Sequence, residues 1–144
     1  MSDQTIKLIA AGVLLVHGLG HGGALGALAW IRTYPGTPAG GWLAARSWLV
    51  PSLAGDTATT IAAAFWIVSL VGFVIATMSF WGVVVPHSVW RPLAVASAIV
   101  STIGIVFFLG TWPVNYTLAA LGVNVAVLVV VLWLRWPPEA MLGG

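Results

Sequence analysis

The sequence contains very few charged side chains. Five Lys or Arg residues and three Asp or Glu residues make up 6% of the 144 residues, whereas soluble globular domains carry about 25%. Hydrophobic residues make up 60% of the chain, and the mean hydropathy is +1.07. Because a water-facing surface cannot be built from this composition, the sequence predicts an integral membrane protein that contacts the lipid bilayer.

Other absences narrow the range of functions. Cysteine is absent, which excludes disulfides, thiolate metal sites and a thiol nucleophile. The basic residues are too few and too dispersed for a nucleic-acid-binding face, so no nucleic-acid partner is expected. The long apolar stretches contain no Asp or Glu, and no glycine-rich phosphate loop or nucleophile motif is present. These absences favour a non-catalytic protein over an enzyme.

Four apolar stretches are long enough to cross a membrane as helices, which requires about 20 residues each. They cover about residues 6–31, 57–85, 92–109 and 113–135. Gly110 and Pro113 divide the last two, since glycine suits a helix end and proline a helix start. Unbroken apolar runs indicate helices rather than barrel strands, whose residues alternate. The predicted fold is therefore an all-α, four-helix membrane bundle that forms one transmembrane domain over residues 1–144.

The long first loop, residues 32–56, is expected to contain a short interfacial helix. Its second part reads "GWLAARSWLV", residues 41–50, which is apolar enough to lie at the membrane surface with Arg46 pointing to water or phosphate. Asp56 is expected to cap the following helix. This loop would then cover the outer end of the bundle.

The few basic residues predict an orientation. Lys7, Arg91 and Arg135 lie on one side of the predicted bundle, and Arg32 and Arg46 lie on the other. Since cytoplasmic loops carry the excess of Lys and Arg, both termini are expected in the cytoplasm.

The nine tryptophans lie near the ends of the predicted spans, as in the aromatic belts of membrane proteins. Those expected near the outer boundary are Trp30, Trp42, Trp48, Trp66 and Trp112. Those expected near the inner boundary are Trp81, Trp90, Trp133 and Trp136.

Two histidines lie inside the first predicted span, in "VLLVHGLGHGGALGALAW". His17 and His21 are four residues apart, so both imidazoles lie on one face of the helix. An unpaired polar group in hydrocarbon costs several kcal/mol, so these side chains need polar partners. Candidates for a shared polar layer near the middle of the other spans are Ser69, Thr77, Ser97, Ser101 and Asn124.

Two interpretations of the histidines remain open. In the first, His17 bonds to Asn124 or to a serine and fixes the register of the bundle. In the second, His17 or His21 binds a cofactor. A catalytic zinc usually has three protein ligands, and the third histidine, His87, lies in a loop away from this pair. One histidine suffices as a single axial ligand for haem or a chlorin. The favoured expectation is that no cofactor binds, and haem or a chlorin is the second expectation.

A stripe of glycines runs along a neighbouring face of the same segment. Gly18, Gly22 and Gly26 are spaced four residues apart, which lets another helix approach closely. The stripe and the abundant tryptophan suit contact with other helices and lipid. The favoured function is therefore a non-catalytic subunit of a larger membrane assembly or of a homo-oligomer. The alternatives are a haem-, pigment- or metal-binding protein that uses His17 and His21, and a small oligomeric transporter.

The "HGLGH" motif, residues 17–21, the four spans and the chain length together resemble small bacterial membrane proteins that are similar in size and topology to DoxX-like proteins. The resemblance covers the whole chain in architecture, but only this short motif in residues. It implies a bacterial source and an inner-membrane location, and it implies no activity.

The predicted orientation is tested with one introduced cysteine, because the chain has none of its own. We expect Thr37→Cys, in the first loop, to react with a membrane-impermeant thiol reagent added outside the inner membrane, because the positive-inside rule places this loop in the periplasm. Labelling of Thr37→Cys only after permeabilisation would reverse the orientation.

Overall fold

The computed structural model describes residues 2–34, 36, 45–109 and 111–138. Its elements are α1 (Asp3–Thr33), α2 (Gly55–Phe80), the short 3-10 turn η1 (His87–Val89), α3 (Trp90–Phe107), α4 (Val114–Leu128) and the π-helical segment η2 (Val129–Trp133). Four helical segments are long and apolar enough to cross a membrane, the third including η1 and the fourth including η2. The prediction of an all-helical fold with four such helices is confirmed, and the chain is a candidate multi-pass membrane protein.

The helix ends follow local chemistry. α1 begins at Asp3 because the Ser2 hydroxyl accepts a hydrogen bond from the Thr5 amide at 3.3 Å, which satisfies one of the free N–H groups of the first turn. α2 ends at Phe80, five residues before the predicted end, because Gly82 adopts a φ of 65° that stops the helix. Asp56 lies in the first turn of α2 and does not cap it; Ala54 occupies the cap position.

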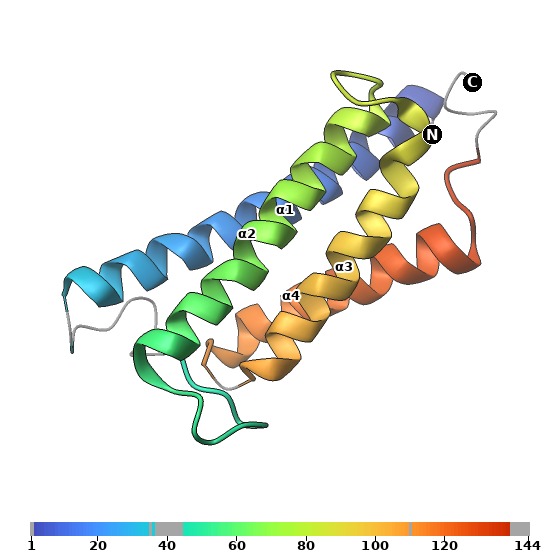
Figure 1. Cartoon of the computed structure of the whole chain (residues 1–144). Helices are drawn as coiled ribbons and strands as arrows, with labels where there is room; N and C mark the ends of the chain where they lie inside the picture. Colours follow the sequence, from blue (N-terminus) through green and yellow to red (C-terminus); the bar gives the residue numbers. More distant parts are fainter. Residues whose placement is uncertain (1, 35, 37–44, 110, 139–144) are drawn as a thin grey trace.

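Each helix packs mainly against its neighbours in the sequence. α2 and α3 form the central pair, α1 packs on α2, and α4 packs on α3. Figure 1 shows α1 crossing behind α2 and α4 crossing behind α3. Among the described residues, α1 and α4 do not form a packed pair. The bundle is therefore an open series of helices, with α1 and α4 at its two flanks.

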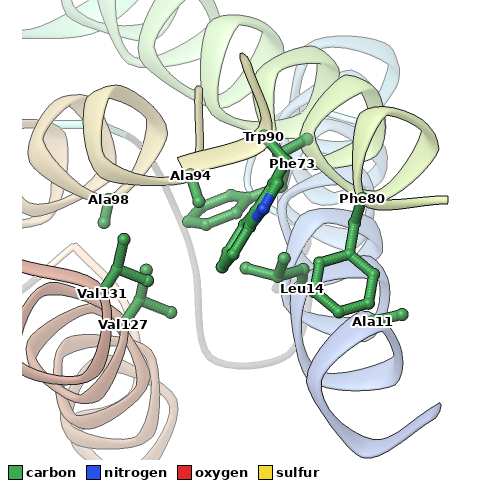
Figure 2. Close-up of a cluster of buried hydrophobic side chains, with 10 residues drawn as sticks. Ala11, Leu14, Phe73, Phe80, Trp90, Ala94, Ala98, Val127 and Val131 are labelled. Atoms are coloured by element: carbon green, nitrogen blue, oxygen red, sulfur yellow. The ribbon is translucent and has the colours of Figure 1, made fainter. Parts of the chain in front are cut away.

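Two clusters of buried apolar side chains fill the bundle. One contains Leu14, Phe73, Trp90 and Val127, so all four helices contribute to it. Figure 2 shows Leu14 of α1 on one side of the Phe73 and Trp90 rings, and Val127 and Val131 of α4 on the other side. The second cluster lies toward the other end, around Trp66 and Phe108. Large aromatic rings thus lie between α1 and α4 and keep these two helices from packing directly on each other.

The described part of the first loop differs from the predicted interfacial helix. Residues 45–54 form a turn closed by a bridge between Arg46 and Ala54, with no helix; residues 41–44 of the predicted helix lie outside the described residues. The Ser47 hydroxyl donates to the Phe107 carbonyl at 2.9 Å, and the Trp48 indole donates to the Val106 carbonyl. The last carbonyls of a helix have no partner within it, so this loop caps the end of α3.

The closest helix approaches involve glycines, but not the whole predicted stripe. A Cβ at Gly18 would lie 2.9 Å from Cβ of Phe73, which places α1 tightly against α2. A Cβ at Gly22 would meet only a leucine methyl at 3.9 Å, and one at Gly26 would meet nothing within 4 Å. Gly104 of α3 makes the comparable approach to α2, where a Cβ would lie 2.8 Å from Cβ of Phe65. The close contact is therefore local to Gly18 on α1.

Gly18→Ala and Gly26→Ala form a matched pair of substitutions on one helix. Alanine favours a helix over glycine by about 1 kcal/mol at either position, so their difference reports packing alone. We expect Gly18→Ala to be less stable than Gly26→Ala by about 1–3 kcal/mol, because the added methyl overpacks the contact with Phe73. The measurement is reversible unfolding in mild detergent. Equal stabilities would show that α1 and α2 can separate freely at Gly18.

Candidate functional site

A chain of hydrogen bonds connects three helices in the middle of the bundle. Nε2 of His17 on α1 lies 2.7 Å from Oδ1 of Asn124 on α4. Nδ2 of Asn124 donates to Oγ of Ser101 on α3 at 2.8 Å. Oγ of Ser101 in turn lies 3.1 Å from Nε2 of His21, which returns the chain to α1. These four residues, called here the polar network, lie between the two apolar clusters, and Asn124 and Ser101 are fully buried.

The other predicted members of the polar layer do not join the polar network. The Ser97 hydroxyl donates to the Leu93 carbonyl, and the Thr77 hydroxyl donates to the Phe73 carbonyl, each one turn back on its own helix. Ser69 is fully buried, and its hydroxyl has no hydrogen-bond partner among the described residues. Hydroxyls can bond to the carbonyl four residues earlier, so their depth alone does not bring them into a shared network.

Aromatic rings hold the two imidazoles in place. The His21 ring is nearly parallel to Trp66, at 5.5 Å between centroids and 10°, and to Phe73, at 6.2 Å and 9°. The His17 ring meets the His21 ring edge-on, at 5.1 Å and 72°. Rings packed in this way lose little further entropy when a nitrogen forms a bond. The imidazoles are thus preoriented.

Trp66 is placed differently from the predicted aromatic belt. Its side chain is fully buried and stacks on His21, rather than lying at the outer boundary. The spacing of the buried residues on α2 carries a signal for this position, since every third or fourth residue faces the core. These residues are Ala58, Ala62, Trp66, Ser69, Phe73 and Ala76.

A cavity of about 600 Å³ lies between α1 and α4, beside the polar network. This α1/α4 groove reaches the outside of the bundle, because its lining residues Val16 and Tyr116 are 70% and 58% exposed. His17, His21 and Trp66 also line it. Most of its other walls are apolar or glycine, as in Val13, Gly20, Ile105, Ala119, Ala120 and Val123. The space that α1 and α4 leave between them is therefore a groove with polar groups on one wall.

The polar wall of the groove carries no formal charge. None of the lining residues is Asp, Glu, Lys or Arg. Trp66 Nε1 is buried without an acceptor among the described residues. The Nδ1 atoms of His17 and His21 are not among the sealed, unpaired polar atoms, and both Nε2 atoms belong to the polar network. The groove thus offers two imidazole nitrogens to a neutral molecule, whereas the indole N–H of Trp66 is sealed from it.

A metal centre does not fit this donor set. The described residues contain no group of three or more His, Cys, Asp or Glu side chains that could hold a metal ion. A haem or chlorin with an axial histidine would have to use an Nδ1 atom, since the two Nε2 atoms already hydrogen bond. Nδ1 lies closer to the backbone of its own helix, which crowds a flat macrocycle.

Comparison of the chain with protein-family models, with curated proteins and with solved structures finds no match.

The bond between His17 and Asn124 is tested by two substitutions at His17. The amide nitrogen of glutamine lies as many bonds from Cα as Nε2 of histidine, so His17→Gln can keep the bond, whereas His17→Leu leaves Asn124 without it. Such bonds in membranes contribute about 0.6 kcal/mol on average and roughly 1–2 kcal/mol in peptides. We expect His17→Leu to lose that amount of stability in detergent unfolding and His17→Gln to lose less. An equal loss for both variants would show that the bond contributes nothing.

Proposed function

We propose that this chain is a non-catalytic multi-pass membrane protein that binds a neutral, lipid-soluble molecule in the α1/α4 groove. The observation that supports this proposal is the pairing of a cavity of about 600 Å³ with an uncharged polar wall formed by His17 and His21. Ligand sites typically have volumes of about 300–1,000 Å³, mostly apolar walls and a few placed polar groups. The groove has each of these properties.

The chemistry of the walls argues for a neutral ligand. A charged group transferred into an apolar site needs a counter-charge, and no lining residue supplies one. The apolar surfaces of Val13, Val16 and Val123 suit a hydrocarbon tail or ring. Because Val16 is 70% exposed, a molecule dissolved in the bilayer would reach the groove from the side without crossing water.

The proposal includes a location. The chain would lie in a bacterial inner membrane with both termini in the cytoplasm, as the basic residues and the resemblance at residues 17–21 suggest. The groove would then open into the hydrocarbon region, since His17 lies near the middle of α1 and Asn124 near the middle of the fourth span. Lipid-soluble molecules are concentrated in this region.

The accessory-subunit function is a second candidate, and one observation favours it. Small residues, Gly12 and Gly20 on α1 and Ala119 and Ala120 on α4, line the groove. A Cβ at Gly12 or Gly20 would meet nothing within 4 Å, so a helix from another subunit has room to approach. The transporter alternative gains no such support. The polar network spans one turn of α1, about 6 Å along the axis, and returns to α1 without continuing toward either surface.

Gly20→Leu and Gly23→Leu test the proposed function. Gly20 lines the groove and Gly23 does not, and neither has an atom within 4 Å of an added Cβ. We expect a lipid-soluble molecule to co-purify with the wild-type protein and with Gly23→Leu in mild detergent, and to be lost from Gly20→Leu because leucine occupies the groove.

The measurement is mass spectrometry of solvent extracts from the purified proteins, and an absorption spectrum separates a haem or chlorin from other ligands. Loss of a second membrane protein, rather than of a small molecule, from Gly20→Leu would favour the accessory-subunit function. Equal small-molecule content in all three proteins would contradict binding in the groove.

A further inference from the structure

The polar network is directional, because each of its bonds needs one donor and one acceptor. Asn124 is the central member, and its amide has a donating nitrogen and an accepting oxygen. Ser101 accepts from one neighbour and donates to the other. The two ends of the chain are Nε2 of His17 and Nε2 of His21. Each imidazole is neutral, since an imidazolium in this apolar region would need a counter-charge that no lining residue of the groove provides.

In the first ordering, hydrogen bonds run from His17 to His21. Nε2–H of His17 donates to Oδ1 of Asn124, Nδ2 of Asn124 donates to Ser101, and the Ser101 hydroxyl donates to Nε2 of His21. A neutral imidazole carries one N–H. Nδ1 of His17 is therefore an acceptor, and Nδ1 of His21 is a donor.

Rotating the Asn124 amide by half a turn exchanges its oxygen and nitrogen and reverses every bond. Asn124 then donates to Nε2 of His17 and accepts from Ser101, and Ser101 accepts from Nε2–H of His21. Nδ1 of His17 becomes the donor, and Nδ1 of His21 becomes the acceptor. All four residues remain paired in this ordering as in the first.

We infer that the polar network holds His17 and His21 in opposite tautomers, so that one Nδ1 donor and one Nδ1 acceptor always lie beside the α1/α4 groove. This inference rests on the proposed function for its consequence, the class of ligand. The two ring centroids are 5.1 Å apart, so one head group can contact both rings. Such a head group carries a carbonyl acceptor next to an N–H or O–H donor, as in a primary amide or a protonated carboxylic acid, on an apolar tail.

Trp66 fixes the orientation of one of the two rings. It stacks on His21, and its own indole N–H is sealed from the groove. A carbonyl oxygen beside the rings therefore accepts from the imidazole that carries Nδ1–H. An ester or ketone satisfies this donor but leaves the accepting Nδ1 unpaired. This difference gives the groove its selectivity between head groups.

The tautomers are measured by nitrogen NMR of the full chain in lipid nanodiscs, with ¹⁵N-labelled histidine. Signals of His17 and His21 are assigned from His17→Gln and His21→Gln, and His87 in η1 is an internal reference. We expect one of the two imidazoles to carry Nδ1–H and the other Nε2–H, with mirrored populations if both orderings occur. Ser101→Ala should remove the link and let His21 change its tautomer independently. Equal tautomers in the wild-type protein, or an imidazolium, would overturn the inference.

The ligand class is measured separately with three probes of one chain length: hexadecanamide, hexadecanoic acid and methyl hexadecanoate. We expect the amide, and the acid only where it is protonated, to bind about tenfold more tightly than the ester, which lacks a donor. His17→Phe should reduce this preference. The relative affinities of the amide and the acid show which of these two head groups the groove prefers. Equal binding of all probes would overturn the ligand class alone, whereas binding of none would overturn it together with the proposed function.

Discussion

The hydrogen bond between His17 and Asn124 links two helices that do not otherwise pack as a pair. In a hydrocarbon environment a buried polar group has no water with which to hydrogen bond, so each such group needs a partner within the protein. The bond at 2.7 Å meets this requirement for the two side chains across the open side of the bundle. The further hydrogen bonds to Ser101 and His21 give the buried hydroxyl of α3 a partner as well.

The same constraint accounts for the groove. Phe73 and Trp90 in one apolar cluster, and Trp66 in the other, hold the flanks of the bundle apart. Small residues on the facing sides of α1 and α4 leave the intervening space unfilled. If α1 and α4 packed directly, the imidazoles would be sealed inside the bundle. Instead, their Nε2 atoms hydrogen bond within the bundle, and their Nδ1 atoms lie at a wall of the groove. One pair of histidines thus contributes both to the architecture and to the proposed ligand site.

Much of the architecture could be predicted from the sequence, because length and hydropathy are local properties. The four apolar helices follow from the length and hydropathy of the apolar stretches, and the shared face of His17 and His21 follows from helical periodicity. The partners of individual hydroxyls do not, since Ser97 and Thr77 bond to their own helices and Ser101 bonds across the bundle. That choice depends on how each helix is rotated, which only packing determines.

The positions at which helices make close contact could not be predicted fully from the sequence either. The glycine stripe of α1 predicts a close helix contact, which the structure shows at Gly18, but Gly26 lies on an exposed face of α1 while Ala24 and Leu28 pack in the cluster around Trp66. Trp66 illustrates the same difficulty, because a tryptophan near the end of a span suits a lipid interface as well as a core. The groove arises from two helices that fail to pack, and no local pattern in either helix records that absence of contact.

The central claim is that the α1/α4 groove is a binding site for a neutral, lipid-soluble molecule. The most direct test of this claim is a crystal structure from crystals grown in a lipidic mesophase, at a resolution that separates side-chain atoms. The account predicts continuous non-protein density between Val16 and Ala120, with its polar end within hydrogen-bond distance of an Nδ1 atom of His17 or His21. Close packing of α1 on α4, with no space for a ligand between them, would contradict it.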